Sequence, residues 1–426
     1  MKEMIRRLDD ASRRDFATYL ARACLGVAIA PTFSIGRAMA ASPASGGGKA
    51  KHLIYLYMSG GMTHLDTFDP KPGAETQGPV ESIDTNVPGI RVSQYLARTA
   101  KLMDKIAVVN GMHTTTGAHE QGRYYMRTSY TMRGTIKHPA IGSWLLRMQG
   151  SGNKVLPGYV MIGGGSNEST PGFLENRYAP LPLGSATGGL PYSTPNVPYA
   201  QFEDRLTLAD AFDKSFRKKY QQKQVRAYTN LYHDAIQLMN SKELAVFDLS
   251  KEPQNLRQEY GENNFGQGCL LARRLVENDV KCVEVHMGGW DTHNDNFDRI
   301  EDLVPTLDRG LSALIADLDR RGLLSKTLVV LATEFGRTPL INVNRGRDHH
   351  PAAFSCLLAG AGVKTGQKYG KTDNKGVAVA DNGVTIPDFN ATIGKALGLP
   401  LAEVIKSPSG RPFTFADKGK PVDALV

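Results

Sequence analysis

The chain has 426 residues, of which 41% are hydrophobic and 22% charged, and its formal net charge is +9. This composition is ordinary for a globular protein with a large core and excludes a disordered or fibrous chain. Apart from a short run at 217–219, the Lys and Arg residues are scattered, so the sequence predicts no nucleic-acid partner. A mildly positive surface would instead attract an anionic substrate.

The first 40 residues have the pattern of a twin-arginine export signal. Arg13 and Arg14 precede a weakly apolar run at 23–35, and Ala38-Met39-Ala40 forms a cleavage site. The apolar run is too short to serve as a stable membrane anchor. We therefore predict a signal peptide at 1–40, a flexible linker at 41–51 and a periplasmic or secreted protein. The alternative is an amphipathic first helix.

The cysteines that follow residue 40 carry no functional signal. There are three of them, Cys269, Cys282 and Cys356, and none forms a C-x-x-C pair. An odd number without such a pair argues against a disulfide framework or a zinc knuckle. Each lies in an apolar stretch and is predicted to be a core residue.

Short apolar runs that end in Gly or polar residues predict strands buried on both faces. An amphipathic helix is predicted over 300–318, where apolar residues recur every three or four positions. Strand, helix and strand in this order make a βαβ unit, so we predict an α/β fold with a mostly parallel sheet and helices on both faces. The predicted strands are 52–58, 105–110, 282–286, 327–332 and 353–358.

The middle of the chain has a different character. Residues 163–198 are rich in Gly, Pro, Ser and Asn, and the pattern turns helical and charged from 204 to 249. We interpret 163–261 as an inserted loop and helical cap over one face of the sheet. The remainder of 52–426 is then one domain.

Ligands bind beyond the carboxyl ends of the strands in such sheets, and Asp, Glu and His gather there. Asp291 and His293 follow one strand at a spacing that lets both face one ion. Glu334 directly follows another strand. These residue types bind Zn²⁺, Mn²⁺ or Mg²⁺. The alternatives are a helix cap for Asp291 and a salt bridge to Arg337 for Glu334.

Two further segments could contribute ligands. Asp348, His349 and His350 could bind an ion, with one of them orienting another through a hydrogen bond. Asp66 follows the first strand and is a better candidate than Asp69, which precedes a proline and suits a turn.

A run of hydroxyls, Thr114 to Thr116, follows the second predicted strand. Thr115 and Thr116 stand where a helix would begin, which suits a nucleophile next to a metal ion. The same position suits a helix N-cap, and the residues leave both roles open.

Several motifs together resemble a known family. Residues 59–72 (SGGMTHLDTFDPKP), 289–293 (GWDTH), 334–339 (EFGRTP) and 347–351 (RDHHP) are similar to those of a twin-arginine-exported bacterial family of unknown function in the alkaline phosphatase and sulfatase-like superfamily. The likeness runs from about His52 to the C-terminal region. It is much more specific to the family than to an activity.

The resemblance implies a three-layer α/β/α sandwich of the alkaline phosphatase type with one or two divalent ions at the strand ends. It implies metal ligands at positions that carry the same motifs here: Asp66, Asp291, His293, Glu334, and His349 or His350.

The chain departs from the superfamily pattern at three places. Gly60 stands where other members have an aspartate, and Glu334 begins Glu-Phe-Gly in place of Asp-His-Gly. His119 lies near the expected place of the hydroxyl or cysteine nucleophile. Metal binding tolerates these changes better than phosphatase or sulfatase chemistry does.

We therefore predict an exported hydrolase of phosphate or sulfate esters that uses Zn, Mn, Ca or Mg ions. Its substrate would be a small or polymer-borne anionic ester. The candidate catalytic residues are His119, Thr115, Thr116 and Arg337, and the candidate metal ligands also include Asp348. One alternative is a non-catalytic, metal-stabilised protein of the cell envelope on the same fold. Another is a carbohydrate-active enzyme in which Asp291 and Glu334 face each other without metal.

Overall fold

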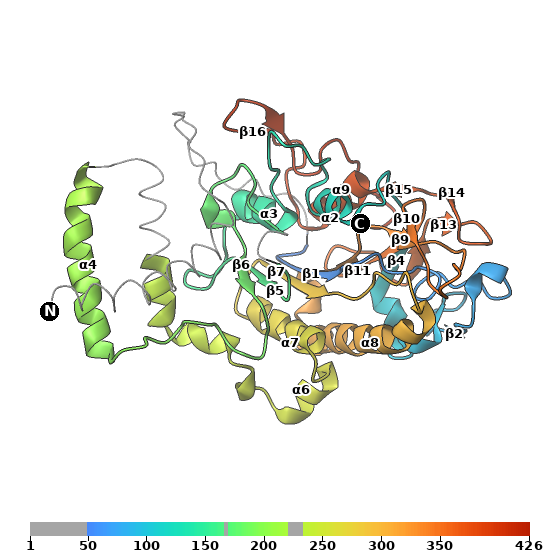
Figure 1. Ribbon diagram of the computed structural model, residues 1–426, viewed down its shortest axis with the longest axis horizontal. Coiled ribbons are helices and arrows are strands. Elements are labelled where there is room, and N and C mark those ends of the chain that lie inside the picture. The colour runs from blue at the N-terminus through green and yellow to red at the C-terminus, as the bar shows by residue number, and fades with distance from the viewer. Residues whose placement is uncertain (1–48, 166–168, 220–232) are drawn as a thin grey trace.

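A computed structural model describes residues 49–165, 169–219 and 233–426. The predicted export signal and most of the predicted linker lie outside these ranges. Figure 1 shows a central sheet with helices on both sides. The fold is a mixed α/β fold with a mostly parallel sheet, as the sequence predicts.

The central sheet has nine strands in the order β12-β4-β11-β8-β1-β7-β5-β6, with β15 also paired to β4. Among the described residues of this sheet, β11 is the strand that runs antiparallel to its neighbours. The strands are β1 His52–Met58, β4 Ile106–His113, β5 Tyr159–Ile162, β6 Leu181–Leu183, β7 Cys282–Met287, β8 Thr327–Ala332, β11 Phe354–Gly360, β12 Gln367–Tyr369 and β15 Val384–Thr385.

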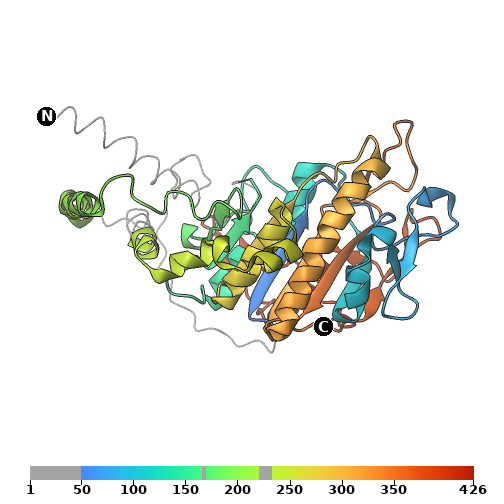
Figure 2. The same cartoon turned by 90° about the horizontal axis from the view of Figure 1, so that it is seen from below.

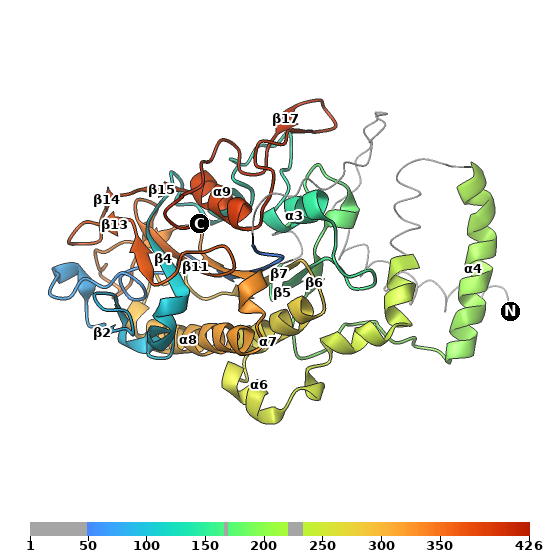
Figure 3. The same cartoon turned by 180° about the vertical axis from the view of Figure 1, so that it is seen from behind.

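The helices form two layers over the sheet. Figures 1 and 2 show α7 and α8 on one face, and Figure 3 shows α9 and α3 on the other. The helices are α2 His119–Thr128, α3 Ile141–Gln149, α4 Tyr199–Lys219, α6 Gln254–Tyr260, α7 Asn264–Glu277, α8 Asn296–Arg320 and α9 Ile386–Ala396. The long helix α8 covers the range predicted from its apolar period.

Strand β1 shows why these apolar runs become central strands. Successive side chains of a strand point to opposite faces, and all seven residues of β1 are buried. Ile54 and Leu56 enter the core under α7 and α8, whereas Tyr55 and Tyr57 enter the core on the other face. A strand covered on both faces needs apolar side chains on both, which removes the polar alternation of a half-exposed strand.

One strand is longer than predicted. Strand β4 continues past Asn110 to His113, because Met112 pairs with Phe354 and Val384 at the end of the sheet. Asn110 is buried within the strand, where its side chain donates to Asp69 and accepts from Ser355, so this polar residue does not end the strand.

The segment predicted as an insertion contains both sheet and helix. Strand β6 pairs with β5 at the edge of the sheet, and α6 packs on α7 and α8. Helix α4 lies apart from the sheet in all three views (Figures 1, 2 and 3). No helix in the described ranges is long and apolar enough to span a membrane.

The remaining strands of the described ranges form small two-stranded sheets. They are β2 Ser82–Asp84 with β3 Arg91–Ser93, β9 Gly336–Arg337 with β10 His349–His350, β13 Lys371–Thr372 with β14 Val379–Asp381, and β16 Ile405–Lys406 with β17 Pro412–Phe413. The β9–β10 pair matters most here because it leads the chain from the carboxyl end of β8 to the amino end of β11. Since β11 is antiparallel to β8, both ends lie at the same edge of the sheet.

Candidate metal site

Four chain segments meet at that edge of the sheet. Helix α2 begins at His119, after the loop that follows β4. Asp291 and His293 lie in the loop between β7 and α8, and Glu334 lies just beyond β8. The β9–β10 pair places His349 opposite Arg337 in register. The parallel strands thus gather side chains that are more than 200 residues apart in the chain.

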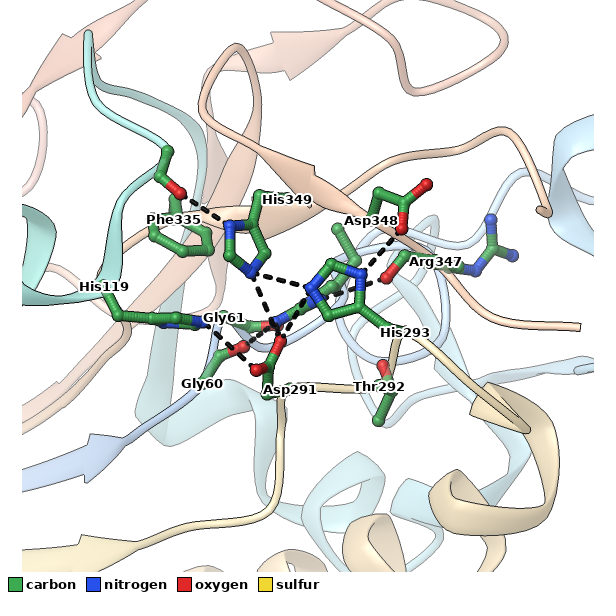
Figure 4. Close-up of polar contacts among 12 residues, drawn as sticks. Gly60, Gly61, His119, Asp291, Thr292, His293, Phe335, Arg347, Asp348 and His349 are labelled. Atoms are coloured by element: carbon green, nitrogen blue, oxygen red, sulfur yellow. Dashed lines mark hydrogen bonds and ion pairs between the residues drawn. The ribbon is translucent and has the colours of Figure 1, made fainter. Parts of the chain in front are cut away.

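The carboxylate of Asp291 lies at the centre of three imidazole rings (Figure 4). The Nε2 atom of His119 is 3.3 Å from Oδ2 of Asp291. The Nε2 atoms of His293 and His349 are 3.2 Å and 3.3 Å from Oδ1 of the same carboxylate. Ligand atoms on a tetrahedral ion with bonds of about 2.0–2.1 Å would lie about 3.3 Å apart, so the separation of each ring from Asp291 is that of two ligands on one ion.

The other nitrogen of each ring is held by a hydrogen-bond acceptor. Nδ1 of His119 is 2.9 Å from Oε1 of Glu334, and Nδ1 of His293 is 2.7 Å from Oδ1 of Asp348. Nδ1 of His349 is 2.6 Å from the backbone oxygen of Gly117. A carbonyl or an ionised carboxylate can only accept, so each Nδ1 must carry the hydrogen. Each Nε2 of a neutral ring is then left with a lone pair.

With neutral rings, the three Nε2 lone pairs and the Asp291 carboxylate would repel one another unless a cation, either a proton or a metal ion, lies among them. Nε2 of His293 and Nε2 of His349 are 2.9 Å apart, close enough to share such a cation. Nε2 of His119 is buried and has no hydrogen-bond partner within the described ranges. His119, Asp291 and His349 each offer a ligand atom, and these atoms lie within 4.8 Å of one another. The donor set fits a divalent metal ion.

Arg337 sets the charge state of this cluster. Burial acts to raise the pKa of Asp291, but its hydrogen bond and ion pair with the Arg337 guanidinium outweigh burial and lower the pKa to about 2. Burial, and then the charge of Arg337, lowers the pKa of His349 below its ordinary value. An ionised carboxylate and a neutral imidazole are the forms that bind metal.

Arg337 is itself buried and held by the backbone. Its guanidinium donates to the backbone oxygens of Gly60, Gly61 and Arg347 as well as to Asp291. Arg337, which was predicted as a catalytic residue, therefore lies in the cluster, but its N–H groups donate to protein atoms.

Glu334 lies behind His119, away from the centre of the cluster. The residue is fully buried, and its Oε1 accepts from the backbone N–H of Gly60 at 2.8 Å as well as from His119. Its Oε2 accepts from the hydroxyl of Tyr57 at 2.9 Å. Burial acts to raise the pKa of Glu334, but these hydrogen bonds, first that of His119, lower it. The ring of His119 lies between Glu334 and Asp291, so the two carboxylates do not face each other.

The site is open on one side. The side chains of Asp291 and His293 are 48% and 40% exposed, whereas Thr292 between them is buried and donates to Asn296. Phe335 closes the inner side, with its ring 5.0 Å from that of His119 and 4.8 Å from that of His349. A ligand could reach the cluster from solvent while its inner wall stays fixed.

Some predicted site residues lie elsewhere. Asp66 is fully buried and pairs with Arg347, with Nε 2.9 Å from Oδ2, and it also accepts from Thr63 and Asn296. Arg347 therefore forms an ion pair with the carboxylate that was predicted from the sequence to be a metal ligand. Within the described ranges, Asp66 makes no direct hydrogen bond or ion pair with His119, Asp291, His293 or His349, and it is connected to the cluster only through Asn296 and Arg347.

The same holds for His350 and the threonine run. Nε2 of His350 bonds to the backbone oxygen of Val377 at 2.7 Å. Thr116 accepts a hydrogen bond from the backbone N–H of Ala118, just before α2, and Thr115 is exposed. Thr116 thus stabilises the turn before α2. The N-cap of α2 is Ala118, whose side chain makes no capping hydrogen bond, so neither threonine is the helix N-cap that the sequence left open.

The sequence did not indicate three residues that complete the site. Tyr57 was interpreted only as part of a strand, and Phe335 only as part of a motif. Gly117 acts through its backbone oxygen, which no side-chain pattern can indicate. The alternation of β1, which places Tyr57 on the same face as the buried end of β8, is the one signal that could have found Tyr57.

Family comparison agrees with the motifs. A family described as "Protein of unknown function (DUF1501)" matches residues 50–426. The chain belongs to this family. Among curated proteins, none matches it by sequence.

Solved structures similar to this chain include alkaline phosphatase and sulfatase-like enzymes. The lipoteichoic acid synthase LtaP from Listeria monocytogenes is 9% identical, with 84% of this chain and 74% of that chain covered and a TM-score of 0.39. PsFucS1 sulfatase from Pseudoalteromonas sp. is 15% identical, with coverages of 83% and 68% and a TM-score of 0.36. A variant of the alkaline phosphatase PafA is 10% identical, with coverages of 88% and 99% and a TM-score of 0.40. At these values, no activity or substrate is transferred from them to this chain.

Proposed function

We propose that this protein is an exported hydrolase of phosphate or sulfate esters that depends on one divalent metal ion. The observation that carries the proposal is the convergence of three Nε2 atoms on the Asp291 carboxylate, each ring held by an acceptor at Nδ1. His119, His293, His349 and Asp291 would hold the ion. A bound divalent ion polarises ester oxygens and lowers the pKa of water.

The protein's own residues prepare this site. Asp348 and the Gly117 carbonyl orient His293 and His349, and Arg337 keeps Asp291 ionised. Asp291 and His293 are partly exposed, so an ester and a water molecule could approach the cluster from that side, and Phe335 packs against His119 and His349 on the inner side. Such fixed charges and dipoles stabilise charge that develops during hydrolysis.

We expect water, and not a threonine, to be the nucleophile. Thr116 is engaged at the turn before α2, and the Thr115 side chain is exposed. Thr115→Ala and Thr116→Ala should therefore keep ester hydrolysis within about threefold of the wild type, because neither removes a ligand or an orienting acceptor. A loss of a hundredfold or more in kcat in either variant would instead identify a covalent nucleophile.

The first test is metal content. The purified protein should contain about one divalent ion per chain by elemental analysis, and His119→Ala, His293→Ala and His349→Ala should each reduce it strongly. His350→Ala is the matched control, because its ring bonds to Val377 outside the cluster. If the wild type carries no stoichiometric ion after loading with Zn²⁺, Mn²⁺ or Ca²⁺, the proposal is wrong.

Activity is the second test. A panel of phosphate and sulfate esters, assayed with each added ion, should show turnover that is lost in His293→Ala. A protein that binds one ion but hydrolyses none of the panel would support the alternative, a metal-stabilised binding or assembly protein of the cell envelope. The fold does not choose between these.

Export is tested separately. Replacing Arg13 and Arg14 with Lys should leave an uncleaved precursor in the cytoplasm, because the twin-arginine pathway reads this pair. Processed protein outside the cytoplasm in that variant would contradict the proposed route.

A further inference from the structure

Two tyrosines on β1 differ in what their hydroxyls contact. Tyr55 and Tyr57 point to the same face of the sheet, both are buried, and their rings stack at 6.3 Å. The hydroxyl of Tyr57 donates to Oε2 of Glu334 at 2.9 Å. The hydroxyl of Tyr55 has no hydrogen-bond partner within the described ranges. Tyr55 therefore serves as a control for the loss of a buried hydroxyl that makes no hydrogen bond.

The hydrogen bond from Tyr57 fixes the rotation of a carboxylate. The terminal torsion of a glutamate is soft, with a broad distribution. In this site Oε2 of Glu334 is held by Tyr57, which turns Oε1 toward Nδ1 of His119 and the N–H of Gly60. Nδ1 of His119 in turn faces an acceptor, so its Nε2 points to the cluster.

Tyr57 is held firmly enough to act in this way. The guanidinium of Arg127 lies 3.7 Å from the centre of the Tyr57 ring, and its Nε donates to Oε1 of Glu284 at 2.8 Å. Arg127 and Glu284 are both buried. Arg127 is in the last turn of α2, the helix that begins with His119. The ring of Tyr57 is thus packed beside the helix that carries the ligand.

We propose that Tyr57 is a positioning residue of the metal site, which acts through Glu334 on the ring of His119. The proposal rests on the proposed function in that the ion is bound by Nε2 of His119. Glu334 then orients a ligand and is not itself bound to the ion. Such acceptors behind a metal-bound histidine set its tautomer and orientation.

The test compares Tyr57→Phe with Tyr55→Phe in the full-length protein. Affinity for Zn²⁺ is measured by competition with a chelator, and the visible absorption of the Co²⁺-loaded protein reports ligand geometry. Tyr57→Phe should raise the Kd for Zn²⁺ by about tenfold or more and shift the Co²⁺ bands, whereas Tyr55→Phe should change the Kd by less than about twofold. Equal effects of the two variants, or no effect of Tyr57→Phe, would overturn the proposal.

A second variant tests the role of Glu334. Glu334→Gln keeps the shape of the side chain and an oxygen toward His119 but removes the charge. It should still bind one ion per chain when saturated, with a Kd raised about 10–100-fold. Loss of stoichiometric binding at saturating Zn²⁺ would show that Glu334 is a ligand and would overturn its orienting role.

A metal-independent readout separates this proposal from the proposed function. If the wild type binds no ion, the proposed function is wrong, and the link from Tyr57 is decided by ¹⁵N spectra of the histidine side chains in the metal-free protein. The Nδ1 signal of His119, assigned with His119→Gln, should shift in Tyr57→Phe and stay in place in Tyr55→Phe. An unchanged signal in both would overturn the link.

Discussion

The histidine side chains of this chain differ in their hydrogen-bond partners and in their burial. In the cluster, each ring has an acceptor at Nδ1 and a common centre at Nε2. His64 is fully buried outside that cluster: its Nε2 bonds to the backbone oxygen of Gly376 at 2.8 Å, and its Nδ1 has no partner within the described ranges. Burial lowers the pKa of His64 to about 4, although the charge of Asp69 opposes it. His64 is therefore neutral in the folded protein near neutral pH.

His64 should make folding sensitive to acid. The pKa of His64 is below the ordinary value of 6.5, so the unfolded chain takes up this proton first as the pH falls. Above about pH 6.5, His64 is neutral in both the folded and the unfolded chain and does not reduce stability. Between about pH 6.5 and 4, its burial lowers the free energy of unfolding by about 1.4 kcal/mol for each pH unit of decrease. Over this range, urea unfolding should show a shallower loss for His64→Gln, which cannot take up a proton. Equal pH slopes in the two proteins would contradict this assignment.

At the scale of elements, the turn after β1 decides how closely the segments meet. Gly60 and Gly61 have φ angles of +121° and +81°. A Cβ on Gly60 would lie 2.5 Å from the backbone nitrogen of Asp291 and 2.8 Å from the carbonyl carbon of Trp290. The loop that carries Asp291 therefore packs directly on the backbone of this turn. A side chain larger than that of glycine has no space at this position.

Gly60→Ala should disrupt both the fold and the site. Strain at positive φ and the overlap with Asp291 should together lower the free energy of unfolding by more than about 3 kcal/mol. Affinity for Zn²⁺ should fall with it, since Asp291 must move. Gly73→Ala is the control: its φ is +83°, but nothing lies within 4 Å of the added Cβ, so a loss of about 1 kcal/mol is expected. A similar loss in both variants, measured by urea unfolding, would show that contact with the Asp291 loop is unimportant.

At the scale of the whole molecule, the candidate metal site brings together segments that leave different strands of the sheet. His119 begins α2, Asp291 lies between β7 and α8, and His349 lies in the β9–β10 pair. These three residues come together only in the folded chain. An ion that they hold would therefore bind the folded state alone and stabilise it by mass action.

Stability should therefore depend on free metal. Above the Kd, each tenfold increase in free Zn²⁺ should raise the free energy of unfolding by about 1.4 kcal/mol, and a chelator should lower the melting temperature. His349→Ala should lose this dependence, whereas His350→Ala should keep it because its ring bonds to Val377. Melting curves recorded across a series of buffered metal concentrations provide the measurement. Equal dependence in the two variants would exclude His349 as a ligand.

Much of the fold could be predicted from local pattern. Strands such as β1 and β8 are buried on both faces and must be apolar throughout, and α8 shows the helical period of a helix on a sheet. These patterns also place Asp291 and Glu334 just beyond strands, where parallel sheets bind ligands. Local sequence therefore determined the fold class and the edge of the sheet at which the polar residues gather.

Only the tertiary structure decided which of those residues meet. Asp66 was predicted to be a metal ligand but forms an ion pair with Arg347. His119 and His349 instead lie close to Asp291. Asp66 and Arg347 are 281 positions apart, and His119 lies in a segment far from both Asp291 and His349 in the sequence. A buried polar group must find a partner, and sheet order, together with the close approach permitted by a glycine turn, determines which partner is within reach. No local period of the sequence carries that information.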